Sequence, residues 1–429
     1  MTRKLAEFIA DARFEEIPVE DTRRAVLDWL GSALAGSIEA PAKIVQCLNF
    51  GASEEATVFS SRRASAAVAA LRNGVASHIL EFDDVHKGST LHAAAPIIPA
   101  ALAVGEREHA SGRAFLLAVA VGYEAAFRIG EAVNPSHYRF WHPTGTVATF
   151  GAAAAAGSIL HLNADQMVNA LGSAGTQAAG LWEFNADGTM SKHLHPGKAA
   201  FNGILSADLA RAGFTGASRI LEGKRGFIAA MSDGAPVFDA EIRGWKIVEN
   251  CYKLHSCCGH THTAIDTTLD LRPKIGDRKI AAIEIELYGP GFEIVKEMNP
   301  KTPYQAKFSV AYCVAAALED GCAGLEQFSA DRSAILRKTS VRVAEDLTAK
   351  YPAAWPARVK ITLDDGTVLS GASDYPRGNP ENPVSTGELE RKFVSLVEPR
   401  FGMERARRAL DVIHRLEQVE DMAAAFSNL

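Results

Sequence analysis

Hydrophobic residues near the N-terminus recur at the spacing of an α-helix. Two apolar stripes stand out: Leu5, Phe8 and Ile9, followed by Leu27, Leu30 and Leu34. The members of each set lie three, four or seven positions apart, so each predicts one amphipathic helix. Gly36 follows the second stripe, and we expect it to end that helix in a left-handed cap.

Alanine and glycine dominate the chain between about residues 60 and 230. The run from Gly151 to Gly157 contains five consecutive alanines. Alanine has the highest helix propensity, and small side chains allow helix backbones to approach closely. Charged residues such as Asp165, Glu183 and Lys192 interrupt this region too often for membrane helices. The composition therefore predicts a tightly packed helical core.

The pattern changes to a mixture of strand and helix after about residue 260. Apolar and polar residues alternate over 279–288 and 359–370, as in half-buried strands, and a helical pattern covers 308–318. The second alternating segment contains Asp365–Gly366, a pair favoured in two-residue hairpin turns with positive φ at both positions. Residues 261–385 are therefore predicted to form a smaller α+β unit.

Helical periodicity returns at the C-terminus. Ser385 and Glu388 match a capping box, in which each side chain accepts a hydrogen bond from the other residue's backbone N–H. We therefore predict a mainly α protein, with a large helical domain built from residues 1–260 and 386–429. The α+β unit, 261–385, is predicted to be an inserted lid domain.

Composition excludes several classes of protein. The chain has 429 residues, of which 47% are hydrophobic, and a formal net charge of −6. A mildly acidic chain without a basic run argues against a nucleic-acid partner. We find neither an apolar stretch of the ~20 residues needed to span a membrane nor a signal-peptide pattern, so a cytoplasmic protein is expected. Six cysteines in a chain of this length do not form a disulfide framework.

Known catalytic and metal-binding motifs are not present. The sequence contains no G-x-x-x-x-G-K-[ST], no G-x-G-x-x-G after a strand and no G-x-S-x-G. Histidines and cysteines crowd residues 255–262, but their spacing does not match the usual zinc patterns. We therefore expect no metal and no other cofactor.

Four segments place ionisable groups in otherwise apolar or small-residue surroundings. They are E-F-D-D-V-H with T-L-H at 81–92, W-H-P-T-G-T at 141–146, S-K-H-L-H-P-G-K at 191–198 and Y-K-L-H at 252–255. Aspartate often only caps a helix, and lysine is usually exposed. The accumulation of such groups nevertheless predicts a buried polar site.

These segments, in this order, resemble the MmgE/PrpD family, which includes 2-methylcitrate dehydratase, cis-aconitate decarboxylase and iminodisuccinate epimerase. The similarity extends through S-K-H-L-H-P-G-K-A-A at 191–200, Y-K-L-H-S-C-C at 252–258, A-K-F-S-V-A-Y at 306–312 and Y-P-R-G-N-P-E-N-P at 375–383. The resemblance covers nearly the whole chain. It implies a helical domain made from both termini, a smaller α+β lid and a homodimer.

The resemblance also implies the site residues. The catalytic candidates are His92, His142, Lys192 and Tyr312, and the substrate-binding candidates are Lys253, Glu81, Asp83, Asp84, His195 and Cys258. Three positions depart from the decarboxylase pattern: its acidic residue appears as Glu81, its threonine as Val85 and a pocket histidine as Cys258. These departures concern substrate preference more than proton transfer.

The family's reactions share a carbanion next to a carboxylate. Fixed positive charge stabilises such a species, and a histidine can exchange the proton near neutral pH. We expect a cofactor-independent lyase, a dehydratase or decarboxylase, acting on a small di- or tricarboxylate. Two alternatives are an epimerase of a substituted succinate such as iminodisuccinate, and a non-catalytic helical scaffold with a degenerate pocket.

Overall fold

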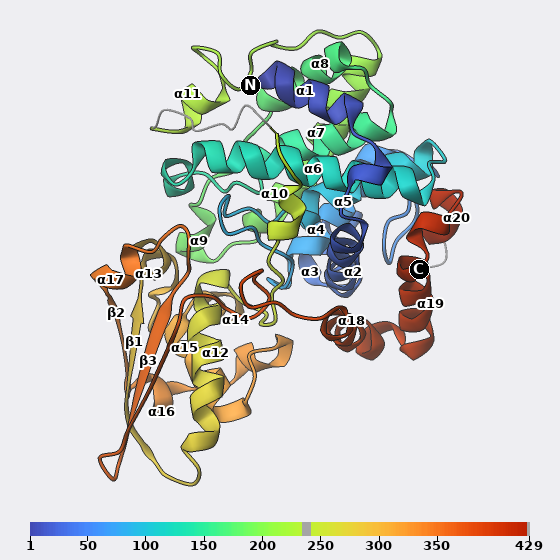
Figure 1. Cartoon of the computed structure of the whole chain (residues 1–429). Coiled ribbons are helices and arrows are strands. Elements are labelled where there is room, and N and C mark those ends of the chain that lie inside the picture. The colour runs from blue at the N-terminus through green and yellow to red at the C-terminus, as the bar shows by residue number, and fades with distance from the viewer. Residues whose placement is uncertain (234–241, 427–429) are drawn as a thin grey trace. The chain divides into compact units, whose positions relative to one another are not determined.

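The computed structural model describes residues 1–233 and 242–426, which form two compact units. The first unit comprises Met1–Ile79, Asp83–Asn250 and Ser385–Leu429, and the second comprises Leu80–Phe82 and Cys251–Val384. Most of the regular structure is helical, and the strands of the described residues all belong to the second unit (Figure 1). The fold is therefore mainly α with a small α+β part.

The first unit is a set of packed helices. They are α1 (Thr2–Asp11), α2 (Val19–Gly36), α3 (Ala40–Gln46), α4 (Ala66–His78), α5 (Ala94–Arg107), α6 (Gly112–Val133), α7 (Val147–Ile159), α8 (Ala164–Gly175), α9 (Phe184–Asp187), α10 (Ser191–Arg211), α11 (Phe227–Met231), α18 (Thr386–Phe401), α19 (Met403–His414) and α20 (Met422–Phe426). Both predicted N-terminal helices are present as α1 and α2. None of the described helices is long and apolar enough to cross a membrane.

Small residues bring the central helices of the first unit together, as predicted. A Cβ added at Gly74 of α4 would lie 2.8 Å from the Cα of Gly197 in α10. Gly122 of α6 and Gly151 of α7 meet in the same way, because a Cβ on either would lie within 3 Å of the other's carbonyl oxygen. These glycines permit backbone-to-backbone packing that a larger side chain would prevent.

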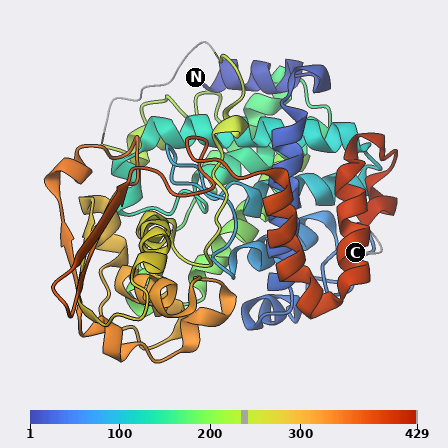
Figure 2. The same ribbon diagram turned by 60° about the horizontal axis from the view of Figure 1, so that its bottom comes forward.

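The two ends of the chain pack together through α2 and α18, which lie side by side in Figures 1 and 2. Lys392 of α18 donates to Asp28 of α2 at 2.6 Å, and both side chains are buried. The predicted capping box is also present, since the Glu388 N–H donates to Ser385 Oγ and the Ser385 N–H to the Glu388 carboxylate.

Gly36 corrects one expectation. It is the last residue of α2, as predicted, but it does not adopt the left-handed conformation of a helix cap. A Cβ at this position would lie 2.0 Å from the carbonyl oxygen of Ala76 in α4. Close contact between two helices therefore explains this glycine, rather than the geometry of the helix end.

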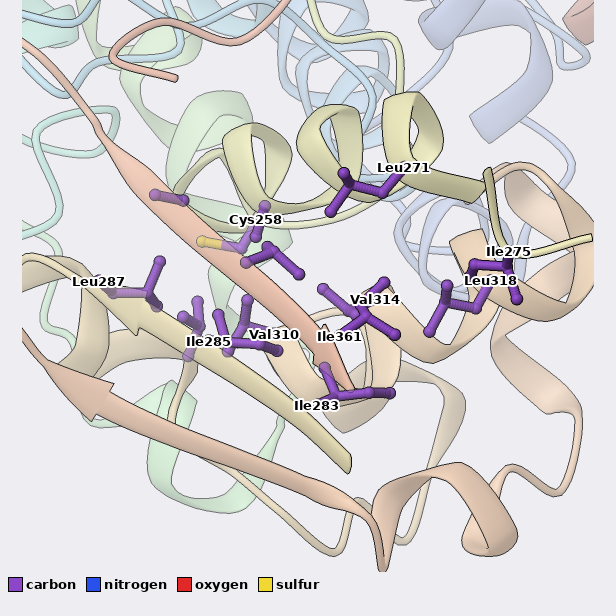
Figure 3. Close-up of a cluster of buried hydrophobic side chains, with 14 of the residues drawn as sticks. Cys258, Leu271, Ile275, Ile283, Ile285, Leu287, Val310, Val314, Leu318 and Ile361 are labelled. Carbon is purple, nitrogen blue, oxygen red and sulfur yellow. The ribbon is translucent and has the colours of Figure 1, made fainter. Parts of the chain in front are cut away.

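The second unit packs helices against a sheet. Its helices are α12 (His262–Leu271), α13 (Gly289–Val295), α14 (Pro303–Ala306), α15 (Val310–Asp320), α16 (Ser333–Leu336) and α17 (Glu345–Thr348). Its strands are β1 (Ile280–Leu287), β2 (Thr339–Val343), β3 (Ala357–Leu363) and β4 (Val368–Ser373), in the order β2-β1-β3-β4. The β1–β2 pair is parallel and the other pairs are antiparallel. Figure 3 shows apolar side chains of β1, β3 and α15 meeting in the core of this unit.

The β3–β4 hairpin is present, but its turn differs from the expected one. Leu363 N–H donates to Thr367 O and Gly366 N–H to Leu363 O, so the loop contains three residues. Gly366 has a φ of 81°, whereas Asp365 is not left-handed. Three-residue loops commonly combine a turn with one left-handed glycine, so the Asp–Gly pair predicted the hairpin but not the turn type.

We expect Gly74→Ala to destabilise the first unit. The added methyl group would collide with the backbone of Gly197, and overpacking typically costs ~1–3 kcal/mol. Gly387→Ala is the matched control, because a Cβ there meets only the end of the Arg391 side chain at 3.7 Å. That control should be neutral or stabilising by up to ~1 kcal/mol, since alanine favours helix. Urea unfolding of both variants measures the difference, and equal effects would contradict the packing argument.

Candidate active site

The structure divides the ten predicted site residues between the two units. Six of them lie in the first unit: Asp83, Asp84, His92, His142, Lys192 and His195. The other four lie in the second unit: Glu81, Lys253, Cys258 and Tyr312.

Asp84 anchors the loop that carries the first group. One carboxylate oxygen accepts from the backbone N–H of Ala94 at the start of α5, and the other accepts from the hydroxyl of Tyr123 in α6. The side chain is fully buried, and burial raises its pKa to about 7, with Asp83 nearby adding to the rise. Asp84 therefore combines the role of a helix cap with that of a buried titratable group.

His92 lies just before α5 and is held by the same loop. Its Nδ1 lies 2.6 Å from the carbonyl oxygen of Asp84 and 3.6 Å from a carboxylate oxygen of Asp83. A carbonyl oxygen only accepts hydrogen bonds, so Nδ1 carries the proton and Nε2 carries the lone pair. The side chain of His92 is 12% exposed, which makes it the most accessible of the histidines around Asp83.

His142 follows Trp141 in the turn before α7. Its Nδ1 lies 2.9 Å from Nδ1 of His195, so one of these two nitrogens donates and the other accepts. Burial lowers the pKa of His142 well below its usual value, and the neighbouring His195, His78 and Lys192 lower it further. Burial also lowers the pKa of His195 to about 3, with His78, Lys198 and Lys192 adding to the effect. Both imidazoles are therefore neutral at physiological pH.

The first two turns of α10 present three basic groups at positions i, i+3 and i+6. Lys192 is buried and its charge acts on both His142 and His195. Lys198 instead donates to the carbonyl oxygens of Gly145, Gln177 and Ala179, and burial lowers its pKa to about 8. Lys198 thus fixes the turn that follows His142. Its residue type gave no sign of this positioning role.

His78, at the end of α4, is part of the site although the sequence did not suggest it. Its Nδ1 lies 2.7 Å from a carboxylate oxygen of Asp83, and both side chains are completely buried. The His78 ring contacts that of His92 edge-on at 4.8 Å and stacks on that of His142 at 5.6 Å between centroids. The signal was a histidine five positions before a predicted aspartate, in an alanine-rich helix.

The second unit brings Glu81 and Lys253 together. Their charged groups lie 3.7 Å apart, the Lys253 Nζ also donates to the Glu81 carbonyl at 3.1 Å, and both side chains are about 1% exposed. Glu81 has a φ of 57°, a left-handed conformation that costs about 1 kcal/mol or more for a residue with a Cβ. Strain of this kind is typical of functional sites.

Cys258 lies among apolar side chains, and Tyr312 lies against an aromatic ring and backbone carbonyls. Cys258 belongs to the hydrophobic core with residues of β1 and α15, as Figure 3 shows. The Tyr312 hydroxyl donates to the carbonyl oxygens of Gln327 and Ala330, and its ring stacks on Phe328.

Tyr304 was not predicted from the sequence. Burial raises its pKa well above the usual value, and Glu81 and Cys258 raise it further. Tyr304 is therefore the tyrosine close to Glu81.

The histidines at 255–262 have separate partners. His255 pairs with Asp266 at 2.8 Å, His260 bonds to Tyr288, and His262 Nε2 lies 3.3 Å from the carbonyl oxygen of Cys257. These contacts lie within the packed second unit and account for the histidine-rich sequence as structural hydrogen bonding.

The first-unit group can transfer a proton beside a fixed positive charge. An oriented imidazole offers a lone pair at Nε2 of His92, while Lys192 supplies charge in a buried setting. Such an arrangement suits carbon-acid chemistry next to a carboxylate.

Family models match this chain over most of its length. The MmgE/PrpD N-terminal domain matches residues 3–238, and the MmgE/PrpD C-terminal domain matches residues 255–418. The chain belongs to the MmgE/PrpD family. The loop at 81–92 and the start of α10 fall within the N-terminal family domain, and Lys253 lies just before the C-terminal one.

Relatives within the family cover almost the whole chain. The cis-aconitate decarboxylase-like protein oryM of Aspergillus oryzae is 28% identical over 99% of this chain and 96% of its own length. The cis-aconitate decarboxylase of Aspergillus terreus is 26% identical over 99% of this chain and 94% of its own length. The human cis-aconitate decarboxylase is 27% identical over 94% of this chain and 88% of its own length.

We expect Asp84→Asn to remove part of the pH dependence of stability. With a pKa of about 7 in the folded protein and about 4 in the unfolded chain, Asp84 keeps its proton on folding while the unfolded chain releases it. Stability therefore falls as pH rises from ~4 to ~7, by about 4 kcal/mol for this group. The asparagine variant has no such proton and should lose this fall.

Urea unfolding between pH 4 and 8 measures the slope. Asp187→Asn, at an exposed position, is the matched control and should keep the wild-type slope. An unchanged slope in Asp84→Asn would show that Asp84 is ionised in the folded protein throughout this range.

Proposed function

We propose that this chain is a cofactor-independent lyase that acts on a small di- or tricarboxylate. The first unit holds an oriented imidazole, His92, and a buried lysine, Lys192, and both of them act on His142. These are the two requirements of a reaction that passes through a carbanion next to a carboxylate. The decarboxylase relatives support the same class of reaction.

The hydrogen bonding of His92 carries the proposal. The Asp84 carbonyl fixes the proton on Nδ1, and Asp83 lies on the same side of the ring. Nε2 is thereby the basic nitrogen, and it can accept a proton from a substrate carbon or, once protonated, return one. We therefore assign the proton transfer to His92, the more exposed of the two candidate histidines.

His142 has a different role in this proposal. Its low pKa keeps it neutral, so it is poorly suited to be a proton donor that must first be protonated. A neutral imidazole paired with His195 can hold a substrate oxygen by a hydrogen bond. His142 and His195 then orient the substrate, while Lys192 neutralises its charge.

The same residues serve either lyase reaction. In a dehydration, His92 takes the proton from carbon and the electron pair forms the double bond, while the hydroxyl group takes a proton from solvent and leaves as water. In a decarboxylation, the bond to the carboxylate breaks as CO₂ leaves, and the electron pair left on carbon takes a proton from His92. In both cases Lys192 stabilises the negative charge that develops next to the remaining carboxylate.

The three departures from the decarboxylase pattern bear on which substrates the chain accepts. Glu81 and Cys258 lie in the second unit, where Glu81 pairs with Lys253. We propose that Lys253 binds a second carboxylate and that Glu81 and Val85 set which polycarboxylate is accepted. A lid role for the second unit, a homodimer and a cytoplasmic location also remain predictions.

Incubation in D₂O distinguishes the candidate reactions. The panel is cis-aconitate, 2-methylcitrate and iminodisuccinate, followed by NMR and by CO₂ release. We expect elimination of water or loss of CO₂ from one of the first two compounds. Deuterium exchange with inversion of iminodisuccinate would identify an epimerase instead, and no reaction with any compound would favour the scaffold alternative.

His92→Asn tests the proton transfer. Asparagine retains an N–H that reaches the Asp84 carbonyl but lacks the basic Nε2. We expect turnover to fall by ~10²–10⁴-fold with little change in melting temperature, as is typical for loss of a general base. His161→Asn, at an exposed left-handed position that asparagine also tolerates, is the matched control. Full turnover in His92→Asn would exclude His92 as the base.

Lys192→Met tests the fixed charge. Methionine preserves much of the buried side-chain volume but removes the ammonium group, so the developing charge loses its partner. We expect kcat to fall by at least ~10²-fold. Lys224→Met, at an exposed position, should retain wild-type turnover. If Lys192→Met unfolds or turns over normally, Lys192 has a structural role only.

A further inference from the structure

Three histidines of the first unit converge although they lie far apart in sequence. His78 ends α4, His92 precedes α5 and His142 precedes α7. Each offers one ring nitrogen such that the three nitrogens lie within 4.8 Å of one another. The expectation that no metal binds rested on the cluster at 255–262, where spacing could be judged; no spacing rule gathers positions 78, 92 and 142.

Hydrogen bonds at Nδ1 determine which nitrogens face the common space. His78 Nδ1 bonds to the Asp83 carboxylate, His92 Nδ1 to the Asp84 carbonyl and His142 Nδ1 to His195. His78 and His142 therefore have Nε2 left as the ligand atom, and the proton that the Asp84 carbonyl fixes on Nδ1 of His92 puts the lone pair of that ring on Nε2 as well. Nε2 of His78 and Nε2 of His142 are buried and have no hydrogen-bond partner among the described residues.

Two unsatisfied nitrogens in one buried cluster are costly. Leaving a buried polar atom unpaired costs ~1–3 kcal/mol, and native structures rarely tolerate several together. Three imidazoles with convergent lone pairs are a ligand set of divalent zinc, whose catalytic sites keep a fourth position for water or substrate. Mg²⁺ and Ca²⁺ prefer oxygen ligands and do not fit.

We propose that His78, His92 and His142 bind one Zn²⁺ through their Nε2 atoms, and that the bound ion inhibits the enzyme. Zinc–nitrogen bonds of ~2.0–2.1 Å in a tetrahedron place the nitrogens about 3.4 Å apart. The nitrogens lie within 4.8 Å of one another, so the longest separation must shorten by up to about 1.4 Å when the ion binds. Zinc binding also selects the tautomer in which His142 Nδ1 donates to His195.

The surrounding groups match the outer shell of a zinc site. Ligating histidines usually donate their other N–H to a carboxylate or a backbone carbonyl, which fixes the ring and raises its basicity. Asp83 and the Asp84 carbonyl supply these acceptors to His78 and His92. Burial keeps His142 neutral, as a ligand must be.

The charged groups around the three histidines have opposite effects on the binding of a cation. Asp83 attracts a cation, whereas the ammonium group of Lys192 acts on His142 and repels one. Asp84 adds negative charge only where its carboxyl is ionised. Removing the charge of Lys192 should therefore favour zinc binding, whereas the proposed catalysis requires that charge. The two proposals thus predict opposite effects for the same substitution.

A second possible metal group, His86 with Glu131 and Glu249, differs in this respect. The ammonium group of Lys246 lies 3.0 Å from Glu131 and 3.1 Å from Glu249 and already offsets part of their negative charge. The cluster at His78, His92 and His142 is therefore the stronger site.

Inhibition follows from the proposed function, because zinc would occupy the Nε2 lone pair that His92 uses for proton transfer. The binding itself does not depend on that function. Zn²⁺ binding to chelator-stripped protein, measured by calorimetry and elemental analysis without substrate, therefore tests the site alone. We expect one Zn²⁺ per wild-type chain, and a visible Co²⁺ spectrum of tetrahedral type when Co²⁺ replaces it.

His78→Asn and His92→Asn are the decisive variants. Each keeps an N–H for the Nδ1 hydrogen bond and removes Nε2, so the buried acceptors remain satisfied while a ligand is lost. We expect zinc affinity to fall by more than the ~10–100-fold that loss of an outer-shell partner costs. His161→Asn should bind zinc like wild type.

Lys192→Met separates this proposal from the catalytic one. It should lose turnover yet bind one Zn²⁺ at least as tightly as wild type, since a repelling charge is removed. No stoichiometric binding to the wild type, unchanged affinity in both asparagine variants, or weaker binding in Lys192→Met would overturn the zinc site. Wild-type turnover that persists with the site filled would overturn the inhibition.

Discussion

The hydrogen bonds of Asp84 are the constraint on which the candidate site depends. Its carboxylate joins the start of α5 to Tyr123 of α6, and its carbonyl oxygen holds the ring of His92. A single residue thus links helix packing to the orientation of His92, the proposed base. Because the carboxyl is fully buried, it is stable there only with both partners or with a proton. The orientation of His92 is therefore tied to the packing of α5 and α6.

Local sequence patterns predicted the parts of the fold that depend on local physics. The capping box at Ser385, the strand of β1 and the close packing of glycine-containing helices all follow from neighbouring residues. Gly36 and the Asp365–Gly366 turn show the limit. Each residue type was explained by a local rule, but Gly36 serves a contact with Ala76 in another helix. At both positions the glycine indicated an unusual local requirement, but the residue type did not reveal which interaction imposes it.

The candidate site was predicted by resemblance more than by pattern, and the missing members show why. His78 and Lys198 are ordinary residues of helices in the sequence, and their roles arise only from partners across space, Asp83 and the carbonyl oxygens near residue 145. The low pKa of His142 likewise comes from burial and from charges on other elements. Tyr312 was predicted from the resemblance as a catalytic candidate, and the structure adds that its hydroxyl donates to the backbone carbonyl oxygens of Gln327 and Ala330. The sequence alone does not reveal which polar groups form structural hydrogen bonds in the folded chain.

The distribution of the departures from the decarboxylase pattern suggests how this family separates chemistry from substrate choice. The catalytic residues predicted in the first unit, His92, His142 and Lys192, all match the family pattern. Of the three changed positions, Val85 is apolar and buried, and Glu81 and Cys258 lie in the second unit. A carbanion next to a carboxylate makes the same demands in every substrate, so its stabilising groups cannot vary. Glu81 lies 3.7 Å from Lys253, so its carboxylate offsets the positive charge of that lysine. If Lys253 binds an anionic group as proposed, that group meets less net charge than an unpaired lysine would offer, and this is how Glu81 can affect which polycarboxylate is accepted.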